Sequence, residues 1–466
     1  MSRPQRYFSR TSGALAALTA ASALVRLLHL RETGAATGTD GYYYLVQVED
    51  LVSEGALHVP DGSWVLRALA APHALGLPAL DGLMLGSAAL AAAAVPLGWL
   101  AGRRLGGPAA GWWLALWAAG SPSLTLLAAE FPKNLGVIPA GLALLASPTL
   151  SLYALGAALL TFTAHRTGAA LLLTGGAGAA AGGRPRIALG LGGALLIGGA
   201  LAAWGGGLGT ADLARLEGSL SLRTWPPLVG VIALTGAPWP LAAELWLGWL
   251  ALLGAPWLLR DPNGRGWRAA LLAGIAVCVA VPWQTATADL GYRLALLAPA
   301  LSAPLLAVWL GARRPLTQAG SVALAVLALG ISPSGYRHAD APPYGSWAAL
   351  IATVPRPLPS LMITPVGLSF LYDHLTGEEA MAWAPEPALD RDAVGRLAVG
   401  IDPEDWEAWG EGEITWLRGD WAYLGEGAWE AYCERAPAEL IDPRNPREVR
   451  PAWLTRGRSA QTEGAP

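Results

Sequence analysis

Two acidic residues stand beside long apolar runs, where a carboxylate can act as a general base or a metal ligand. Asp40 follows the apolar run Ser12–Leu30, and Glu130 lies between two further apolar runs. Residues Tyr43–Leu57, after Asp40, have the pattern of an amphipathic helix that lies along a membrane interface. The alternative role for Asp40 is an N-terminal cap of that helix, for which aspartate is well suited.

Lys133 is the one lysine in a chain whose other permanently cationic side chains are all arginine. Lysine carries a compact charge with three rotatable donors and binds phosphate readily. Its alternative role is that of an anchor at a helix end, paired with Glu130. Because arginine is used everywhere else, the lysine favours a function in binding.

Three further polar points interrupt the apolar sequence. His165 and Arg166 lie between two short runs and could bind phosphate, donate a proton or ligate a metal; the alternative is a simple turn. Arg223 lies in the polar segment 209–227, which is either a mobile loop over a site or a solvated loop. Arg293 opens a late apolar run and could neutralise a phosphate or only anchor the helix.

Together these residues make a set of acids and cations that suits a phosphate leaving group on a lipid carrier. Cations stabilise the departing phosphate, and a carboxylate activates the acceptor hydroxyl or amide. The predicted catalytic residues are Asp40 and Glu130, and the predicted substrate-binding residues are Lys133, Asn134, His165, Arg166, Arg223, Arg293 and Tyr43.

The composition indicates that lipid is the solvent for much of the chain. Of its 466 residues, 53% are hydrophobic and only 14% are charged, whereas soluble proteins average about 25% charged residues. The net charge of -3 argues against a nucleic-acid partner, and two distant cysteines do not indicate a disulfide framework. About eleven transmembrane helices are predicted: Ser12–Leu30, Ala79–Leu100, Gly107–Ala128, Leu135–Leu150, Ser151–Ala164, Thr167–Ala181, Ile187–Leu208, Leu228–Leu259, Trp267–Val281, Leu294–Leu310 and Gly320–Ile331.

The arginines predict the orientation of these helices, because cytoplasmic loops of membrane proteins are enriched in positive charge. The N-terminal run has no clear cleavage site and is interpreted as a retained helix. The N-terminus is therefore predicted in the cytoplasm of a multi-pass protein of the cell (inner) membrane, and all five candidate loops on the extracytoplasmic face. The expected cytoplasmic arginines are Arg103, Arg104, Arg184, Arg186, Arg260, Arg265, Arg268, Arg313 and Arg314.

The last part of the chain changes character and becomes acidic and rich in tryptophan. We predict a transmembrane domain over residues 1–334 and a small soluble α/β extracytoplasmic domain over residues 335–466. Within it, Val366–Leu371 is expected as a strand and Tyr372–Ala380 as a turn and helix.

Three segments resemble the GT-C membrane glycosyltransferases, which include oligosaccharyltransferase catalytic subunits and protein mannosyltransferases. They are Thr39–Tyr44 (TDGYYY), Glu130–Gly136 (EFPKNLG) and Gly291–Leu294 (GYRL). The resemblance implies a GT-C-like polytopic α-helical fold, a long first extracytoplasmic loop and a sugar donor linked to polyprenyl phosphate.

The resemblance also implies roles for single residues. Asp40 is the catalytic candidate, Glu130 a metal ligand or acceptor-side residue, and Arg293 a phosphate or sugar contact. A divalent cation, Mg²⁺ or Mn²⁺, would be held by Asp40 and Glu130, and transfer would invert the anomeric carbon. The acceptor could be a glycan, a lipid or a protein, although the chain lacks Trp-Trp-Asp-Tyr-Gly, the peptide-reading motif of oligosaccharyltransferases.

Two other classes of function stay open from the residues alone. A polytopic transporter or flippase of a lipid-linked substrate needs ionisable residues deep in the membrane, and Glu244 is the main candidate. A scaffold protein would instead present the acidic tail to a partner.

Overall fold

The structure is a computed structural model in which two compact units can be described. The first unit comprises residues 1–34, 48–338 and 452–466, and the second comprises residues 35–47 and 339–451. The predicted domain boundary at residue 334 stays a prediction. The described residues are 3–38, 40–58, 61–147, 152–164, 166–181, 185–204, 239–260, 264–279, 288–313, 318–338, 344–356, 358, 361–364, 366–382, 394–399, 414–416 and 421–424.

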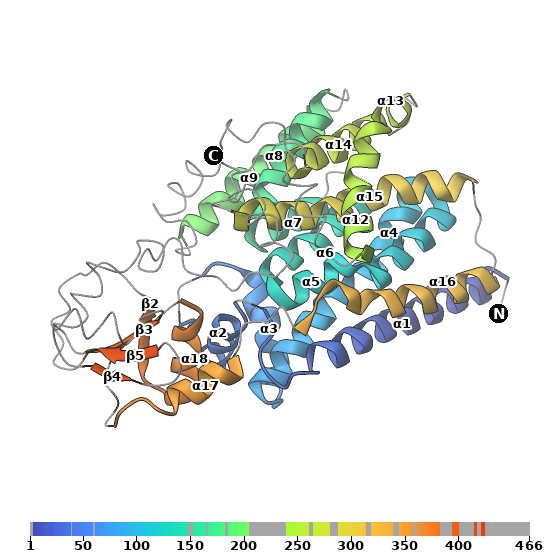
Figure 1. The fold of residues 1–466 in the computed structure, drawn as a ribbon. Helices are drawn as coiled ribbons and strands as arrows, with labels where there is room; N and C mark the ends of the chain where they lie inside the picture. Colours follow the sequence, from blue (N-terminus) through green and yellow to red (C-terminus); the bar gives the residue numbers. More distant parts are fainter. Residues whose placement is uncertain are drawn as a thin grey trace, which may run out of the picture. The chain divides into compact units, whose positions relative to one another are not determined.

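The described part of the first unit consists of helices (Figure 1). Helix α2 (Gly41–Ser53) begins in the second unit and ends in the first. The others are α1 (Arg3–Leu30), α3 (Trp64–Ala74), α4 (Ala79–Gly120), α5 (Pro122–Glu130), α6 (Pro132–Ala146), α7 (Leu152–Ala164), α8 (Arg166–Ala181), α9 (Pro185–Trp204), α12 (Trp239–Leu253), α13 (Ala255–Leu258), α14 (Arg265–Val279), α15 (Ala288–Arg313), α16 (Gln318–Ile331) and the 3₁₀ turn η2 (Ser332–Gly335).

Three of the described helices are long and apolar enough to cross a membrane, over Thr11–Leu30, Ala79–Gly120 and Arg293–Arg313. Shorter apolar helices, such as Trp239–Leu253, accompany them. The chain is therefore a multi-pass membrane protein built mainly from helices. The count of eleven spans and the orientation of the termini stay predictions.

Helix α4 reverses direction at Gly107, which has φ 86° and ψ -176° and precedes Pro108. Its two arms pack closely, because a Cβ on Gly102 would lie only 2.5 Å from the carbonyl oxygen of Ala110. A Cβ on Gly111 would likewise lie 2.8 Å from the carbonyl oxygen of Trp99. The reversal occurs at the first residue of the predicted span Gly107–Ala128, three residues after the expected cytoplasmic arginine Arg104.

A buried polar cluster ties α1 and α12 to the bend between α4 and α5. Arg26 of α1 is fully buried and donates hydrogen bonds to Thr125 Oγ1 (3.1 Å) and to the carbonyl oxygen of Ala118 (2.9 Å). Glu244 of α12 accepts hydrogen bonds from Trp117 Nε1 and from the backbone N–H of Ser123, both at 2.8 Å. These contacts satisfy charges that would be costly to leave unpaired among apolar helices.

The described part of the second unit combines a five-stranded sheet with the helices α17 (Tyr344–Ile351) and α18 (Val366–Thr376). The strands are β1 (Leu361–Thr364), β2 (Glu379–Ala382), β3 (Val394–Val399), β4 (Ile414–Trp416) and β5 (Trp421–Leu424), in the order β2-β1-β3-β5-β4. Strand β1 pairs in parallel with β2 and β3, whereas β5 is antiparallel to β3 and β4. The apolar core lies between α17, α18 and β1.

The prediction of a strand over Val366–Leu371 is wrong, because this segment begins α18. Leu368, Leu371 and Tyr372 are all buried, and a spacing of three and four residues places side chains on one face of a helix. The helix ends at Gly377, whose φ of 71° suits glycine. Strand β2 follows directly.

Candidate functional site

The predicted loop that contains Glu130, Lys133 and Asn134 is a bend between α5 and α6. Pro132 disfavours a helical conformation at the preceding residue, and Phe131 accordingly adopts φ -138° and ψ 61°. Glu130 therefore ends α5, while Pro132, Lys133 and Asn134 form the first turn of α6. No side chain caps this turn at the N-cap residue, and the N-terminus of a helix attracts anions through its backbone N–H groups and dipole.

The polar residues at this bend are buried. Glu130 is 2% exposed and Asn134 is fully buried. Neither polar atom of the Asn134 side chain has a hydrogen-bond partner within the described part of the chain. A buried amide without partners destabilises the fold, so its presence in native proteins usually has a specific reason.

Lys133 forms an ion pair with Asp61, which precedes α3. Lys133 Nζ lies 2.8 Å from Asp61 Oδ2, and both side chains are about four-fifths buried, with 17% and 20% of their surface exposed. The other oxygen of Asp61 accepts a hydrogen bond of 2.7 Å from the backbone N–H of Ser63. The carboxylate is thus oriented by the backbone and holds the lysine ammonium in place.

Two contacts hold this part of α3 against α6 and α7. Gly136 permits the close approach, because a Cβ there would lie 2.4 Å from Val65 Cγ2. Ser63 Oγ donates a 2.7 Å hydrogen bond to the carbonyl oxygen of Ala164, the last residue of α7. The first loop, the α5–α6 bend and the end of α7 therefore meet at one end of the first unit.

Arg293 of α15 joins the same region. Its guanidinium carbon lies 4.2 Å from the centre of the Phe131 ring, in a cation–π contact. Such a contact holds the cation beside the bend. The structure thus brings together four of the predicted site residues, namely Glu130, Lys133, Asn134 and Arg293.

The remaining predicted residues divide into two groups. His165 and Arg223 lie outside the described residues, and Arg166 is described only as the first backbone position of α8. Asp40 and Tyr43 belong to the second unit. The backbone carbonyl of Asp40 accepts a 3.1 Å hydrogen bond from the N–H of Tyr44, which puts Asp40 directly before the first turn of α2.

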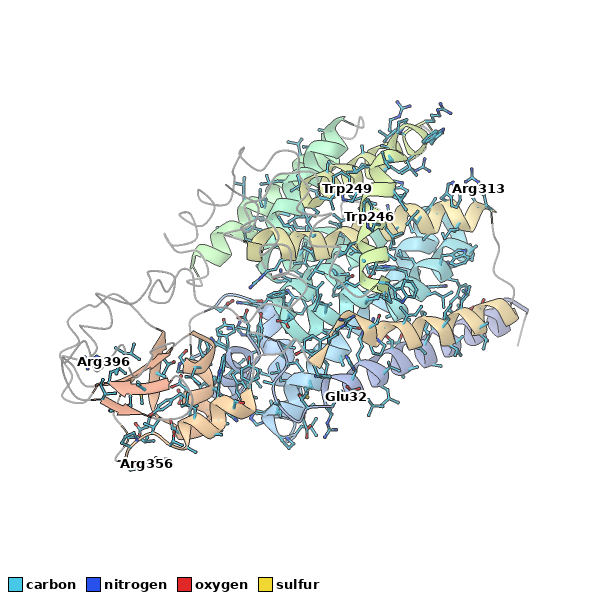
Figure 2. All side chains as sticks on the ribbon, viewed as in Figure 1. Glu32, Trp246, Trp249, Arg313, Arg356 and Arg396 are labelled. Atoms are coloured by element: carbon cyan, nitrogen blue, oxygen red, sulfur yellow. The ribbon has the colours of Figure 1, made fainter. Side chains whose placement is uncertain are left out.

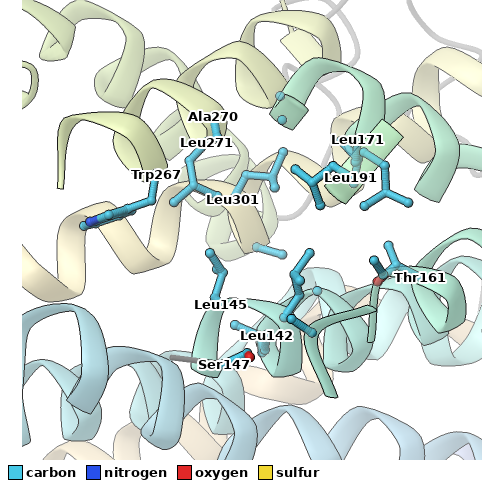
Figure 3. A pocket seen from close by; sticks show the side chains of 18 of the residues that line it. Leu142, Leu145, Ser147, Thr161, Leu171, Leu191, Trp267, Ala270, Leu271 and Leu301 are labelled. Carbon is cyan, nitrogen blue, oxygen red and sulfur yellow. The ribbon is translucent and has the colours of Figure 1, made fainter. Parts of the chain in front are cut away.

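A mainly apolar cavity of about 410 Å³ lies among α4, α6, α7, α8, α9, α14 and α15 (Figure 3), with Arg104 of α4 in its lining. It begins on α6 at Val137 and Ile138, three and four residues after Asn134, and continues to Leu145. Leu171 and Leu301 line it from α8 and α15. One helix therefore carries a polar first turn followed by an apolar cavity wall, an arrangement that matches a ligand with a polar head and an apolar chain.

The residues around the bend include oxygen ligands of the kind that a hard divalent cation prefers. Glu130 and Asp61 supply carboxylates and Asn134 an amide oxygen, which are ligand types that Mg²⁺ and Mn²⁺ accept. Lys133 neutralises Asp61 directly, so a cation at this bend would depend mainly on Glu130.

Sequence reasoning missed Asp61 and the cavity. Asp61 is separated from Lys133 by 72 positions, and its Pro-Asp-Gly context indicates only a turn. The one signal that could have singled it out is its place in the same predicted extracytoplasmic loop as Asp40. The cavity is formed by helices that are far apart in the chain and whose apolar side chains look alike in sequence.

Comparison of the sequence with protein-family models and with curated proteins finds no match. Solved structures are similar in fold. The archaeal oligosaccharyltransferase AglB from Archaeoglobus fulgidus, in complex with an inhibitory peptide and a dolichol-phosphate, matches with 14% identity over 82% of this chain and 65% of that chain, at a TM-score of 0.49. ArnT from Cupriavidus metallidurans, bound to undecaprenyl phosphate, matches with 13% identity over 89% of this chain and 98% of that chain, at a TM-score of 0.48.

The same Archaeoglobus fulgidus oligosaccharyltransferase in complex with Zn and sulfate matches with 13% identity over 78% of this chain and 62% of that chain, at a TM-score of 0.46. This chain thus covers less than two thirds of the oligosaccharyltransferase. AglB and ArnT are glycosyltransferases of the GT-C fold, the class that the sequence resembles. These TM-scores lie below 0.5, so the roles proposed below rest on the side chains of this chain.

Proposed function

We propose that this protein is a membrane glycosyltransferase that moves a sugar from a polyprenyl-phosphate-linked donor to an extracytoplasmic acceptor. The observation that carries the proposal is the combination on α6 of a buried polar first turn and an apolar cavity wall. A donor of this kind has the same two parts, a charged phosphate and a long hydrocarbon chain.

The phosphate would bind at the first turn of α6. The uncapped helix N-terminus and the guanidinium of Arg293 supply positive charge there, and the ammonium of Lys133, which is paired with Asp61, supplies N–H donors. Asn134, whose amide has no described partner, supplies a hydrogen-bond donor. Cations and fixed donors stabilise the charge that develops on a departing phosphate, which is the largest demand of this reaction.

The hydrocarbon chain would extend from this turn into the cavity. The wall formed by Val137, Ile138 and Leu142 starts one helical turn after Asn134. Burial of apolar surface contributes about 25 cal/mol per Å², so even a few isoprene units in the cavity would bind the donor firmly without any specific polar contact.

In the proposed reaction, the acceptor oxygen or nitrogen attacks the anomeric carbon from the side opposite to the phosphate. The bond from that carbon to the phosphate oxygen breaks, its electron pair stays on the phosphate, and the configuration inverts. Asp40 accepts the proton of the acceptor. Glu130 positions the acceptor or holds a divalent cation, Mg²⁺ or Mn²⁺, which would neutralise the phosphate charge further.

Four residues complete the proposed site on the strength of the sequence. His165, Arg166 and Arg223 would contact the donor, and Tyr43 would lie beside the acceptor. The orientation that the arginines predict, with the N-terminus in the cytoplasm and the C-terminal domain outside, supplies the extracytoplasmic face on which lipid-linked donors are used. A glycan, a lipid or a protein can serve as the acceptor.

The experiment compares two arginines of the same helix after reconstitution into liposomes. Arg293 contacts Phe131 at 4.2 Å, and Arg313, at the other end of α15 (Figure 2), contacts the Trp309 ring at 4.6 Å. Each variant, Arg293→Met and Arg313→Met, removes one cation from an aromatic ring. The assay measures release of polyprenyl phosphate from labelled polyprenyl-phosphate sugars.

A hydrogen bond to a charged group contributes about 1.5–3 kcal/mol, so Arg293→Met should lower turnover by roughly 10- to 150-fold. Arg313→Met should stay within about twofold of the wild type. Equal effects of the two substitutions would remove Arg293 from the site. Undiminished turnover in Asp40→Asn would remove Asp40 from its role as the base.

The contacts of Glu244 do not favour the transporter alternative. Its carboxylate accepts hydrogen bonds from Trp117 and from the backbone of Ser123, which fit a fixed structural role. Movement of the intact donor across liposomes without release of polyprenyl phosphate would support that alternative instead.

A further inference from the structure

Two histidines and a glutamate, none of them assigned to the proposed transfer site, meet at the end of α1. His29 Nδ1 lies 3.2 Å from one oxygen of Glu32, and His338 Nε2 lies 3.3 Å from the other. The ligand atoms of all three residues lie within 4.8 Å of one another. His29 and His338 are mostly buried, with side chains 12% and 16% exposed, while Glu32 is 58% exposed.

The protonation of His29 points to a cation between its ring and Glu32. His29 Nε2 lies 2.9 Å from the carbonyl oxygen of Tyr336, and since a carbonyl only accepts, Nε2 must carry the hydrogen. In the neutral ring, Nδ1 is then an acceptor that faces a carboxylate oxygen, which is also an acceptor. A proton on Nδ1, which makes an ion pair with Glu32, or a metal ion between the two atoms resolves this conflict. A backbone carbonyl that orients the far nitrogen is the usual support of a metal-binding histidine.

His338 can supply the second nitrogen. Its Nε2 lies beside Glu32 and 2.7 Å from the carbonyl oxygen of His29. Its Nδ1 is buried and has no hydrogen-bond partner within the described part of the chain. For Nε2 to act as a ligand, the ring proton must move to the unpartnered Nδ1, and the hydrogen bond from Nε2 to the carbonyl oxygen of His29 is exchanged for the bond to the metal.

The spacing agrees with a zinc ion. Zinc binds histidine nitrogen and carboxylate oxygen at about 2.0–2.2 Å in tetrahedral geometry, which separates neighbouring ligand atoms by about 3.4 Å. Here His29 Nδ1 and His338 Nε2 lie 3.2 and 3.3 Å from different oxygens of Glu32, and one ligand atom from each of the three residues lies within 4.8 Å of the others. Two arginines adjoin the ligands in sequence, Arg31 before Glu32 and Arg337 before His338, and Arg31 is paired with Asp81 at 2.9 Å.

We propose that His29, Glu32 and His338 form a binding site for a divalent transition-metal ion of the zinc class, with the fourth position open to solvent on the side of Glu32. Glu32 lies just beyond α1 (Figure 2). His338 follows η2, at the end of α16, which lies alongside α1 (Figure 1). The metal would fasten the first described helix of this unit to the last one.

The position of the site in the chain gives the metal a structural role. The first unit ends at Gly34 and again at His338, and at both points the chain passes into the second unit. His29 and Glu32 therefore lie within five residues of the first of these points, and His338 lies at the second. A metal here would hold the two departing segments of the first unit together at the point where they leave it.

The test uses full-length, untagged protein in detergent, stripped with a chelator and titrated with Zn²⁺ by calorimetry, with visible absorption of Co²⁺ as a second readout. Wild-type protein should bind zinc through His29, Glu32 and His338, and its Tm should rise with zinc. Glu32→Gln and His338→Gln should each weaken this binding by at least about tenfold. Glu54→Gln, which changes an exposed carboxylate elsewhere in the unit, should bind as the wild type does.

A further variant separates this site from a cation at the α5–α6 bend. Glu130→Gln should retain the zinc that depends on Glu32. Zinc bound equally by the wild type and Glu32→Gln would overturn the proposal, and so would zinc that is lost only in Glu130→Gln. Absence of any zinc or cobalt binding in wild-type protein that retains its native Tm would also overturn it.

Discussion

Replacing Asn134 with leucine should stabilise the protein while it lowers activity. Asn134 is fully buried, and neither its amide nitrogen nor its oxygen has a described hydrogen-bond partner. An unsatisfied buried polar group costs about 1–3 kcal/mol. Leucine has a similar volume and no polar atoms, so Asn134→Leu should raise the free energy of unfolding by about 1–3 kcal/mol.

Thr125→Val is the matched control with the opposite expected sign. Thr125 is also fully buried, but its hydroxyl accepts from Arg26 Nε at 3.1 Å and pairs with Ser332 Oγ at 2.9 Å. The substitution keeps the shape and leaves these partners unsatisfied, so it should lower the free energy of unfolding by about 1–3 kcal/mol. The two variants should then differ by about 2–6 kcal/mol.

Denaturant unfolding in detergent, followed by the fluorescence of the 22 tryptophans, measures this difference. Addition of a polyprenyl-phosphate sugar should raise the Tm of the wild type and have less effect on Asn134→Leu, because the bound donor would use the amide. The reasoning is refuted if Asn134→Leu is destabilised as much as Thr125→Val. In that case the amide has partners in the folded protein and is an ordinary structural residue.

Three further outcomes follow from contacts described above. A double-mutant cycle of Lys133→Met and Asp61→Asn should give a coupling free energy of unfolding of about 1–3 kcal/mol, since this pair is neither fully exposed nor fully buried; additive effects would count against the ion pair. Gly136→Val should lower stability by about 1–3 kcal/mol through its clash with Val65, measured as a lower midpoint of unfolding, and an unchanged midpoint would mean that α3 can move away freely. Burial raises the pKa of Tyr372 to about 12, whereas a tyrosine in the unfolded chain has a pKa of about 10. The unfolded chain therefore loses this proton first, and the stabilising contribution present below about pH 10 is lost as the pH rises towards 12. The tyrosinate absorbance of the wild type minus that of Tyr372→Phe should show the high midpoint, and a midpoint near the ordinary value would contradict it.

The parts of the site that could be predicted are those with a local signal. Glu130, Lys133 and Asn134 are close in sequence, and Pro132 dictates the bend on which they lie. Asp61 could not be predicted as the partner of Lys133, because the ion pair depends on the approach of α3 to α6. That approach depends in turn on a missing side chain at Gly136.

The same distinction applies to the fold. The reversal in α4 has a local signal, in which Gly107 and Pro108 follow two arginines. Segment 366–371 is short, and a short apolar run can form either a strand or a helix. The burial of Leu368, Leu371 and Tyr372, at helical spacing, shows that it forms a helix. The cluster of His29, Glu32 and His338 joins residues that lie about 300 positions apart, so pattern alone could not connect them.

The burial of Arg26 also has a consequence for the order in which the chain enters the membrane. Arg26 lies in the first apolar span, yet the acceptors of its side chain on α4 and α5 are 92 to 99 positions later in the chain. A charged residue at the centre of an isolated helix opposes insertion by about 2.5–3.5 kcal/mol, and Arg26, four residues before the end of the span Thr11–Leu30, opposes it by less. The first helix should therefore insert incompletely when synthesis is stopped before Ala118, and more completely once Thr125 has been made. Arg26→Leu should remove that dependence in an insertion assay on truncated chains.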